Sequence, residues 1–170
     1  LKEKFFSDYE YVVLDDYTEL DLAKNDPSLF LKNHPIPLII DEVQRVPELF
    51  LQLKYIADKS SEKGKIILTG SQSYKLLQNV SDSLAGRICL IDMSSLSMRE
   101  IKNINFDLPF LPTTEYIETR KTHLQSYDNL WKFIQRGSMP ELHDENIEWE
   151  PFYRSYVRTY LERDVAELIN

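Results

Sequence analysis

Leu38-Ile39-Ile40-Asp41-Glu42 is the stretch that decides the fold of this chain. Its apolar run has no polar alternation, which favours a strand covered on both faces, as in a parallel sheet. Two acidic residues stand at its carboxyl end. Pro47 then opens an amphipathic pattern that predicts a helix, and the stretch is therefore interpreted as a buried strand followed by a helix.

The same unit recurs along the first part of the chain. Apolar runs at Tyr11–Leu14, Ile66–Leu68 and Ile88–Ile91 predict three more strands. Helical patterns fall between the strands, at residues 18–24, after Asp26-Pro27 and around residues 74–77. Alternating strands and helices predict an α/β fold, a parallel sheet with flanking helices. In such folds ligands bind beyond the carboxyl ends of the strands.

The last third has a helical character. Ser97 and Glu100 have the spacing of a capping box, and residues 103–114 are expected to form an irregular connection. A helix is predicted over Asn129–Arg136, and another from about Trp149 to the end. We therefore expect a partial core in residues 1–95 and a helical lid or linker appendage in residues 96–170.

The composition excludes several classes of protein. Lys and Arg number 20 against 28 Asp and Glu among 170 residues, a net charge of −8, so nucleic acid is not indicated as a partner. No apolar stretch reaches the ~20 residues of a membrane span. The single cysteine, Cys89, excludes a disulfide framework and favours a buried thiol in a reducing, cytoplasmic compartment. The three histidines are scattered and predict no metal site.

Asp41 and Glu42 are the strongest candidates for chemistry. A buried strand that ends in two acids is the Walker B pattern of P-loop ATPases. Asp41 would hold Mg²⁺ through water, since Mg²⁺ keeps most of its hydration shell. Glu42 would activate the water that attacks the terminal phosphate. The alternative is a strand end with two solvated acids, or an N-cap for the next helix.

Thr69 and Ser71 are the second pair of candidates. They follow the next predicted strand, with Gly70 between them. A short hydroxyl on a rigid element suits a polar sensor of the terminal phosphate or of the attacking water. The alternative is an ordinary turn in which Gly70 supplies the unusual backbone angles.

Taken together, these motifs resemble those of a family of bacterial and archaeal AAA-type P-loop ATPases with a C-terminal domain of unknown function. The resemblance spans nearly the whole chain, in the family's order. The matching motifs are Asp41-Glu42-Val43-Gln44, Leu68-Thr69-Gly70-Ser71, Leu84-Ala85-Gly86-Arg87, Gly137-Ser138-Met139-Pro140 and the tail from Tyr156. The resemblance to this family implies ATP and Mg²⁺ as cofactors. It also makes Arg87 a candidate for neutralising phosphate charge, with a surface ion pair to Asp82 or Asp92 as the alternative.

One departure from the family is informative. The family's phosphate loop ends in Gly-Lys-Thr or Gly-Lys-Ser, whereas the only Gly-Lys pair here, Gly64-Lys65, is followed by Ile66. The chain also begins at Leu1 rather than Met. We therefore expect an internal fragment of an ATPase, inactive alone and without tightly bound ATP or Mg²⁺. The alternative function is a non-catalytic interaction module that binds a protein or nucleic-acid partner.

The resemblance also predicts the order of the strands. P-loop ATPases of this type have the order 5-1-4-3-2, and the four strands predicted here correspond to strands two to five. Without strand one, strands four and five lack their shared neighbour. Unpaired strand edges are templates for pairing, so we expect either a shift of strand five or homo-oligomerisation through these edges.

The tyrosines and arginines of the tail have two interpretations. Tyr153, Tyr156 and Tyr160 recur at helical spacing beside Arg154 and Arg158, which could serve base stacking. Because apolar stripes at helical spacing more often form packing contacts, packing is the favoured interpretation.

Overall fold

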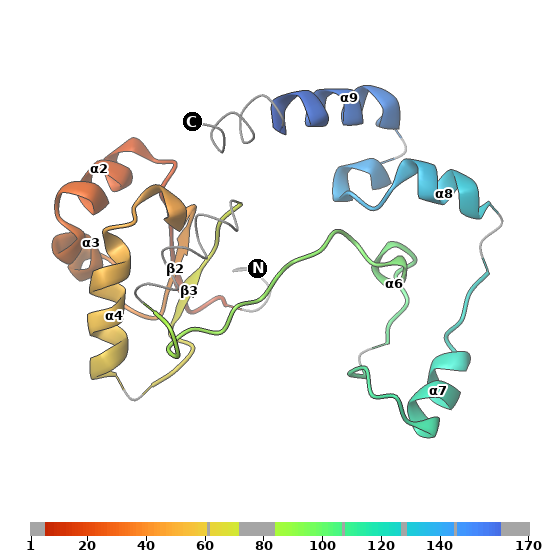
Figure 1. Cartoon of the computed structure of the whole chain (residues 1–170), viewed down its shortest axis with the longest axis horizontal. Coiled ribbons are helices and arrows are strands. Elements are labelled where there is room, and N and C mark those ends of the chain that lie inside the picture. The colour runs from red at the N-terminus through yellow and green to blue at the C-terminus, as the bar shows by residue number, and fades with distance from the viewer. Residues whose placement is uncertain are drawn as a thin grey trace. The chain divides into compact units, whose positions relative to one another are not determined.

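The computed structural model describes residues 6–60, 62–71, 84–106, 108–126, 129–144 and 146–160. It divides into two compact units, residues 1–90 and residues 91–170 (Figure 1). The first unit combines a sheet with helices, and the second is built from helices. The expected α/β fold with a parallel sheet is confirmed. The helix expected around residues 74–77 lies outside the described residues.

The sheet of the first unit has three parallel strands in the order β1-β2-β3. They are β1 (Glu10–Val13), β2 (Leu38–Asp41) and β3 (Ile66–Leu68). Tyr11 lies opposite Ile39 in the register, and Ile39 lies opposite Ile67. The predicted neighbours, strands two, three and four of the ATPase order, are confirmed, with β2 in the middle.

Local capping signals start the helices that connect β1 to β2. The Asp16 side chain accepts hydrogen bonds from the backbone at the start of α2 (Tyr17–Asn25). The Asp26 side chain accepts one from Leu29 at the start of α3 (Pro27–Asn33), where Pro27 needs no partner for its nitrogen. Short polar caps thus turn the chain twice before β2.

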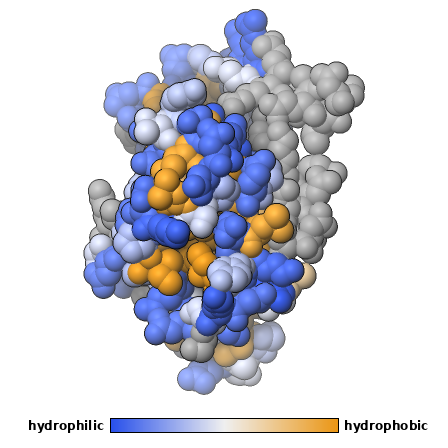
Figure 2. Space-filling model, turned by 90° about the vertical axis from the view of Figure 1, so that its left-hand side faces the viewer, coloured by the Kyte–Doolittle hydropathy of each residue, from blue (hydrophilic) through white to orange (hydrophobic). Residues whose placement is uncertain are grey.

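After β2 come a 3-10 turn, η1 (Val43–Arg45), and helix α4 (Leu49–Lys59). Figure 1 shows α2, α3 and α4 on the same side of β2 and β3. Figure 2 shows the surface on that side, mostly hydrophilic with separate hydrophobic patches. α4 returns from the carboxyl end of β2 toward the start of β3, as the crossover of a parallel βαβ unit requires.

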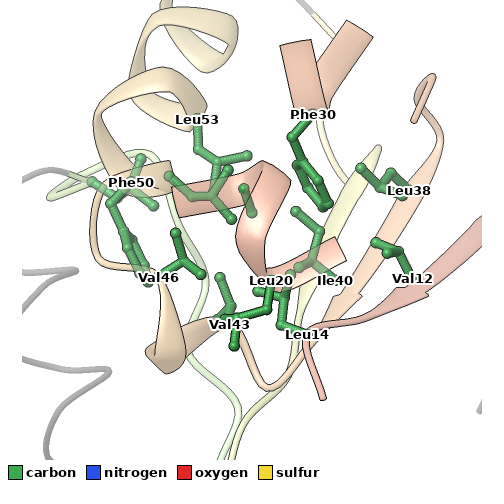
Figure 3. Close-up of a cluster of buried hydrophobic side chains, with 13 residues drawn as sticks. Val12, Leu14, Leu20, Phe30, Leu38, Ile40, Val43, Val46, Phe50 and Leu53 are labelled. Atoms are coloured by element: carbon green, nitrogen blue, oxygen red, sulfur yellow. The ribbon is translucent and has the colours of Figure 1, made fainter. Parts of the chain in front are cut away.

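The core of the first unit lies between these helices and the sheet (Figure 3). Its fully buried members include Phe30, Leu38, Ile40 and Phe50. Leu38 and Ile40 alternate on β2, so they point to the same face, toward the helices. Burial of these apolar side chains is the main force that fixes the carboxyl end of β2 in place.

The second unit is described by itself. Its elements are α6 (Met98–Ile101), α7 (Thr114–Lys121), α8 (Leu130–Arg136), η2 (Pro140–His143) and α9 (Trp149–Tyr160). The Ser97–Glu100 capping box is confirmed, since each side chain bonds the other's backbone nitrogen. Asn129 caps α8, which ends at Gly137 as predicted.

Arg136 and Gly137 hold the connection from α8 to α9. The Arg136 guanidinium donates to the backbone oxygens of Leu142, Asp144 and Ile147. Gly137 has a φ of 78°, and a Cβ atom added there would lie 2.1 Å from the Tyr153 hydroxyl oxygen. The turn therefore needs a residue without a side chain at position 137.

Two sequence predictions are wrong, and one helix was not foreseen. Residues 88–91 form no strand, and Leu90 and Ile91 are 53% and 81% exposed. Cys89, which was expected to be buried, is exposed because it lies in this unpaired segment. Of the two outcomes expected for strand five, the shift beside β3 does not occur in the described residues, and pairing with a second molecule stays a prediction. Helix α7, which begins at the last residue of the predicted irregular connection, was not foreseen.

The interpretation of the tail also needs a correction. The ring of Tyr156 stacks between those of Phe152 and Tyr160, with centroids 6.1 Å and 6.0 Å away. Tyr156 is 43% exposed and Tyr160 52% exposed. The aromatic side chains pack along the helix itself, but these two do not enter a core.

His34 joins three elements of the first unit. Its Nδ1 lies 2.5 Å from Glu10 Oε1 on β1, and its Nε2 lies 2.9 Å from Glu19 Oε2 on α2. His34 itself follows α3, where the helix dipole favours a cation. Both ring nitrogens face carboxylates, which suits the doubly protonated imidazolium. Partial burial lowers the pKa of His34, but the hydrogen bonds to Glu10 and Glu19 and their charges outweigh it and raise the pKa above 6.5.

We predict that this ion pair makes stability depend on pH. Since the pKa of His34 is higher in the folded state, its contribution is complete below pH 6.5 and is lost as the pH rises through the folded-state pKa. Thermal unfolding should therefore show the wild type losing stability relative to His34→Gln from about pH 6.5 upward. A constant difference in melting temperature between the two proteins across this range would contradict the prediction.

Candidate functional site

The candidate site lies at the carboxyl ends of β2 and β3. The backbone hydrogen bonds from Thr69 to Ile40 (3.0 Å) and from Val43 to Thr69 (3.1 Å) extend the pairing past both strands. They bring Asp41 and Glu42 beside Thr69 and Ser71. The structure thus gathers four of the five residues proposed from the sequence.

The Asp41 carboxylate accepts three hydrogen bonds. Thr69 Oγ1 and the Glu42 backbone nitrogen donate to Oδ1, the latter at 3.1 Å, and the Tyr11 hydroxyl donates to Oδ2 at 2.5 Å. Burial raises the pKa of Asp41, but the hydrogen bonds from Thr69, Tyr11 and Glu42 outweigh it and lower the pKa. Asp41 is therefore an anion held in one orientation.

Glu42 has an unusual backbone. Its φ of 58° and ψ of 37° are left-handed, a conformation that costs free energy for a residue with a long side chain. The turn directs Glu42 toward Gln44 and Ser71. Gln44 Nε2 lies 2.5 Å from Glu42 Oε2, and Ser71 Oγ lies 3.5 Å from the same oxygen.

Gln44 supports this carboxylate from a buried position. It is the only buried polar residue among those described, at 9% exposure, and its Oε1 has no hydrogen-bond partner there. Arg45, next along η1, pairs with Asp15, which follows β1. The turn after β2 is thus tied to the neighbouring strand, which limits the positions available to Glu42.

The two hydroxyls differ in availability. A hydroxyl has one hydrogen to donate, and that of Thr69 is committed to Asp41. Ser71 is exposed, and its one contact among the described residues is the long one to Glu42. This geometry favours Ser71 over Thr69 as a sensor and makes Thr69 a support for Asp41.

A family model described as "AAA domain" matches residues 1–102. The chain belongs to the AAA domain family. The match confirms the resemblance to an AAA-type, P-loop ATPase-like family. It covers the sheet and every residue of the candidate site.

The AAA domain has relatives in bacteria and archaea. Uncharacterized proteins of Mycobacterium bovis and Mycobacterium tuberculosis are each 29% identical over 148 residues, which cover 84% of this chain and 27% of the relative. An uncharacterized protein of Methanocaldococcus jannaschii is 27% identical over 176 residues, 98% of this chain and 38% of its own length. The chain thus spans well under half of these relatives. No solved structure matches it.

Arg87 is not brought to the site of this AAA domain. Its side chain pairs with Asp58 near the end of α4 and donates to the Ala85 oxygen at 3.1 Å. Because α4 runs back toward the start of β3, this ion pair lies near the amino ends of the strands, whereas the candidate site lies at their carboxyl ends. The partner is neither of the two acids considered from the sequence.

Sequence reasoning missed Tyr11 and Gln44. Tyr11 was assigned only to a strand, and its contact with Asp41 depends on the register of β1 against β2. The hydrogen bond to Asp41, with burial and the charges of nearby carboxylates, raises the pKa of Tyr11 to about 12. Gln44 stood inside the quoted motif without a role, since nothing in its position signals burial.

Asp41 and Glu42 are the residues of this site that could hold a metal. The described residues hold no cluster of three or more His, Cys, Asp or Glu side chains suited to a metal ion. A site with one fixed carboxylate and a second nearby suits Mg²⁺, which keeps several waters and shares phosphate oxygens.

Across the parts of the chain that the structure describes, no helix is both long enough and apolar enough to span a bilayer.

Proposed function

We propose that Asp41, Glu42 and Ser71 form the metal and water side of an ATP-hydrolysing site. The observation that carries the proposal is the pair of carboxylates at the end of the central strand, one fixed by three hydrogen bonds and the other held by Gln44. Membership of the AAA domain family supports ATP as the nucleotide.

Each residue has a distinct role in this proposal. Asp41 holds the hydration shell of Mg²⁺, and Thr69 keeps Asp41 in orientation. Glu42 accepts a proton from the attacking water, and Ser71 lies beside it to contact the water or the terminal phosphate. Bound Mg²⁺ would neutralise charge on the phosphates. Arg87 has no part in the proposal, because its ion pair lies near the amino ends of the strands.

The phosphate cradle is proposed to come from elsewhere in a longer protein. The 170 residues contain no Gly-Lys-Ser or Gly-Lys-Thr. Backbone N–H groups and the loop lysine hold the phosphates in P-loop enzymes. The much greater length of the relatives supports this proposal. The work that hydrolysis drives belongs to that longer protein.

Asp41→Asn tests the proposal in the longer protein that carries a phosphate loop. We expect the Mg²⁺ concentration for half-maximal ATP turnover to rise by roughly 10–100-fold, the usual cost of altering a group that orients a metal. Steady-state turnover at increasing Mg²⁺ measures it. Asp21→Asn, on the exposed face of α2, is the matched control. An unchanged Mg²⁺ dependence would favour the interaction module instead.

A further inference from the structure

Tyr11 lies one strand away from Asp41 and still reaches it. In the register, Tyr11 lies opposite Ile39, and Val13 lies opposite Asp41. Alternate residues of a strand share a face, so Tyr11 and Asp41 lie on the same face of the sheet. Tyr11 is 44% exposed, yet its hydroxyl is committed to Asp41 Oδ2 at 2.5 Å.

This hydrogen bond changes what the carboxylate can still bind. An ionised carboxylate offers about four acceptor positions, two on each oxygen. Thr69 and the Glu42 nitrogen fill both positions on Oδ1, and Tyr11 fills one on Oδ2. One position remains, on the oxygen that Tyr11 contacts.

The three donors also weaken Asp41 as a direct metal ligand. They withdraw charge from both oxygens, while a direct bond requires Mg²⁺ to give up a water that it releases reluctantly. A water of the hydration shell, by contrast, needs only one acceptor position. The hydroxyl of Tyr11 therefore tips the balance toward contact through water.

We infer that Tyr11 is a positioning residue that restricts Asp41 to a single, water-mediated contact with a divalent cation. This inference rests on the proposed function, since it takes Asp41 as the residue that holds the cation. It adds a residue from β1 to a site otherwise built from the ends of β2 and β3. Tyr11 acts through Asp41 and touches neither metal nor nucleotide.

The test compares two cations on the 170-residue chain. Mg²⁺ can bind directly or through water, whereas hexamminecobalt(III) does not exchange its ligands and binds only through them. Amide resonances of residues 41–43 are followed during each titration by NMR. In Tyr11→Phe we expect the Mg²⁺ concentration at the midpoint to fall roughly fivefold, about the effect of removing one ordinary hydrogen bond. The hexamminecobalt(III) concentration at the midpoint should not change.

Tyr9→Phe is the matched control. It also removes a tyrosine hydroxyl hydrogen bond, to the Gly64 oxygen at 2.6 Å, away from Asp41. Both of its midpoints should equal those of the wild type. If Tyr11→Phe does not give a dispersed spectrum, Tyr11→Leu removes the same hydroxyl and repeats the comparison.

The outcomes separate the inference from the proposed function. If Mg²⁺ shifts the amide resonances of the wild type and the Mg²⁺ midpoint is the same in Tyr11→Phe, the role of Tyr11 is overturned. The proposed metal site is unaffected by that result. A higher Mg²⁺ concentration at the midpoint for Tyr11→Phe would also overturn the role of Tyr11. An equal change in the midpoints for Mg²⁺ and hexamminecobalt(III) would do the same. If neither cation shifts residues 41–43 of the wild type, the inference about Tyr11 is overturned, whereas the proposed metal site is still decided by Asp41→Asn in the longer protein that carries the phosphate loop.

Discussion

Glu42→Gln should lower ATP turnover by roughly 10²–10⁴ in the longer protein with a phosphate loop, the usual contribution of a general base. Glutamine keeps the shape of the side chain and its contact with Gln44, but it cannot take a proton from water. Nucleotide affinity should survive, because the group removed acts on the water. Single-turnover hydrolysis and nucleotide binding, measured on the same preparation, separate the two effects.

Glu48→Gln is the matched control for this prediction. Glu48 is exposed just before α4 and has no contact with the candidate site in the described residues. Its variant should hydrolyse ATP at the wild-type rate. Equal rates for Glu42→Gln and Glu48→Gln would remove Glu42 from the proposed chemistry.

Phe30→Ala should have the largest effect on stability. Phe30 is fully buried between α3 and the sheet, and its ring lies 4.6 Å from that of His34. Truncation leaves a cavity in the core, at a cost of about 3–5 kcal/mol in the free energy of unfolding. The substitution should also remove the ring that packs against His34 at a tilt.

The measurement must report on the first unit. Both tryptophans, Trp131 and Trp149, belong to the second unit, so urea unfolding is best followed through amide resonances of β2. Tyr17→Ala also truncates an aromatic side chain to alanine in the first unit, at a position that is 78% exposed, and should change stability by less than about 0.5 kcal/mol. Similar losses in the two variants would show that the core is assigned wrongly.

Local signals account for the elements that the sequence predicted correctly. Apolar runs closed by polar tips marked β1, β2 and β3, and the caps Asp26 and Ser97 marked helix starts. These signals work because the residues that create them are neighbours in the chain. The pair Asp41-Glu42 was found in the same way, from one strand and its end.

Contacts between distant parts of the chain were beyond such reasoning. The run at residues 88–91 has the composition of a strand, but a strand exists only when a neighbour accepts its hydrogen bonds. Helix α7 has no apolar stripe, and its Tyr116 packs against Phe106 and Phe110 of the preceding segment. Tyr11 reaches Asp41, and Arg87 reaches Asp58, across about 30 residues of sequence, a distance that no local pattern encodes.

The left-handed backbone at Glu42 would shape any laboratory evolution of this domain. A library at position 42 that is selected only for thermal tolerance should drift to glycine or asparagine, which adopt this conformation at little cost. A library selected for turnover should retain glutamate and accept the lower tolerance. The residue at this position would thus report which of the two properties the selection rewarded.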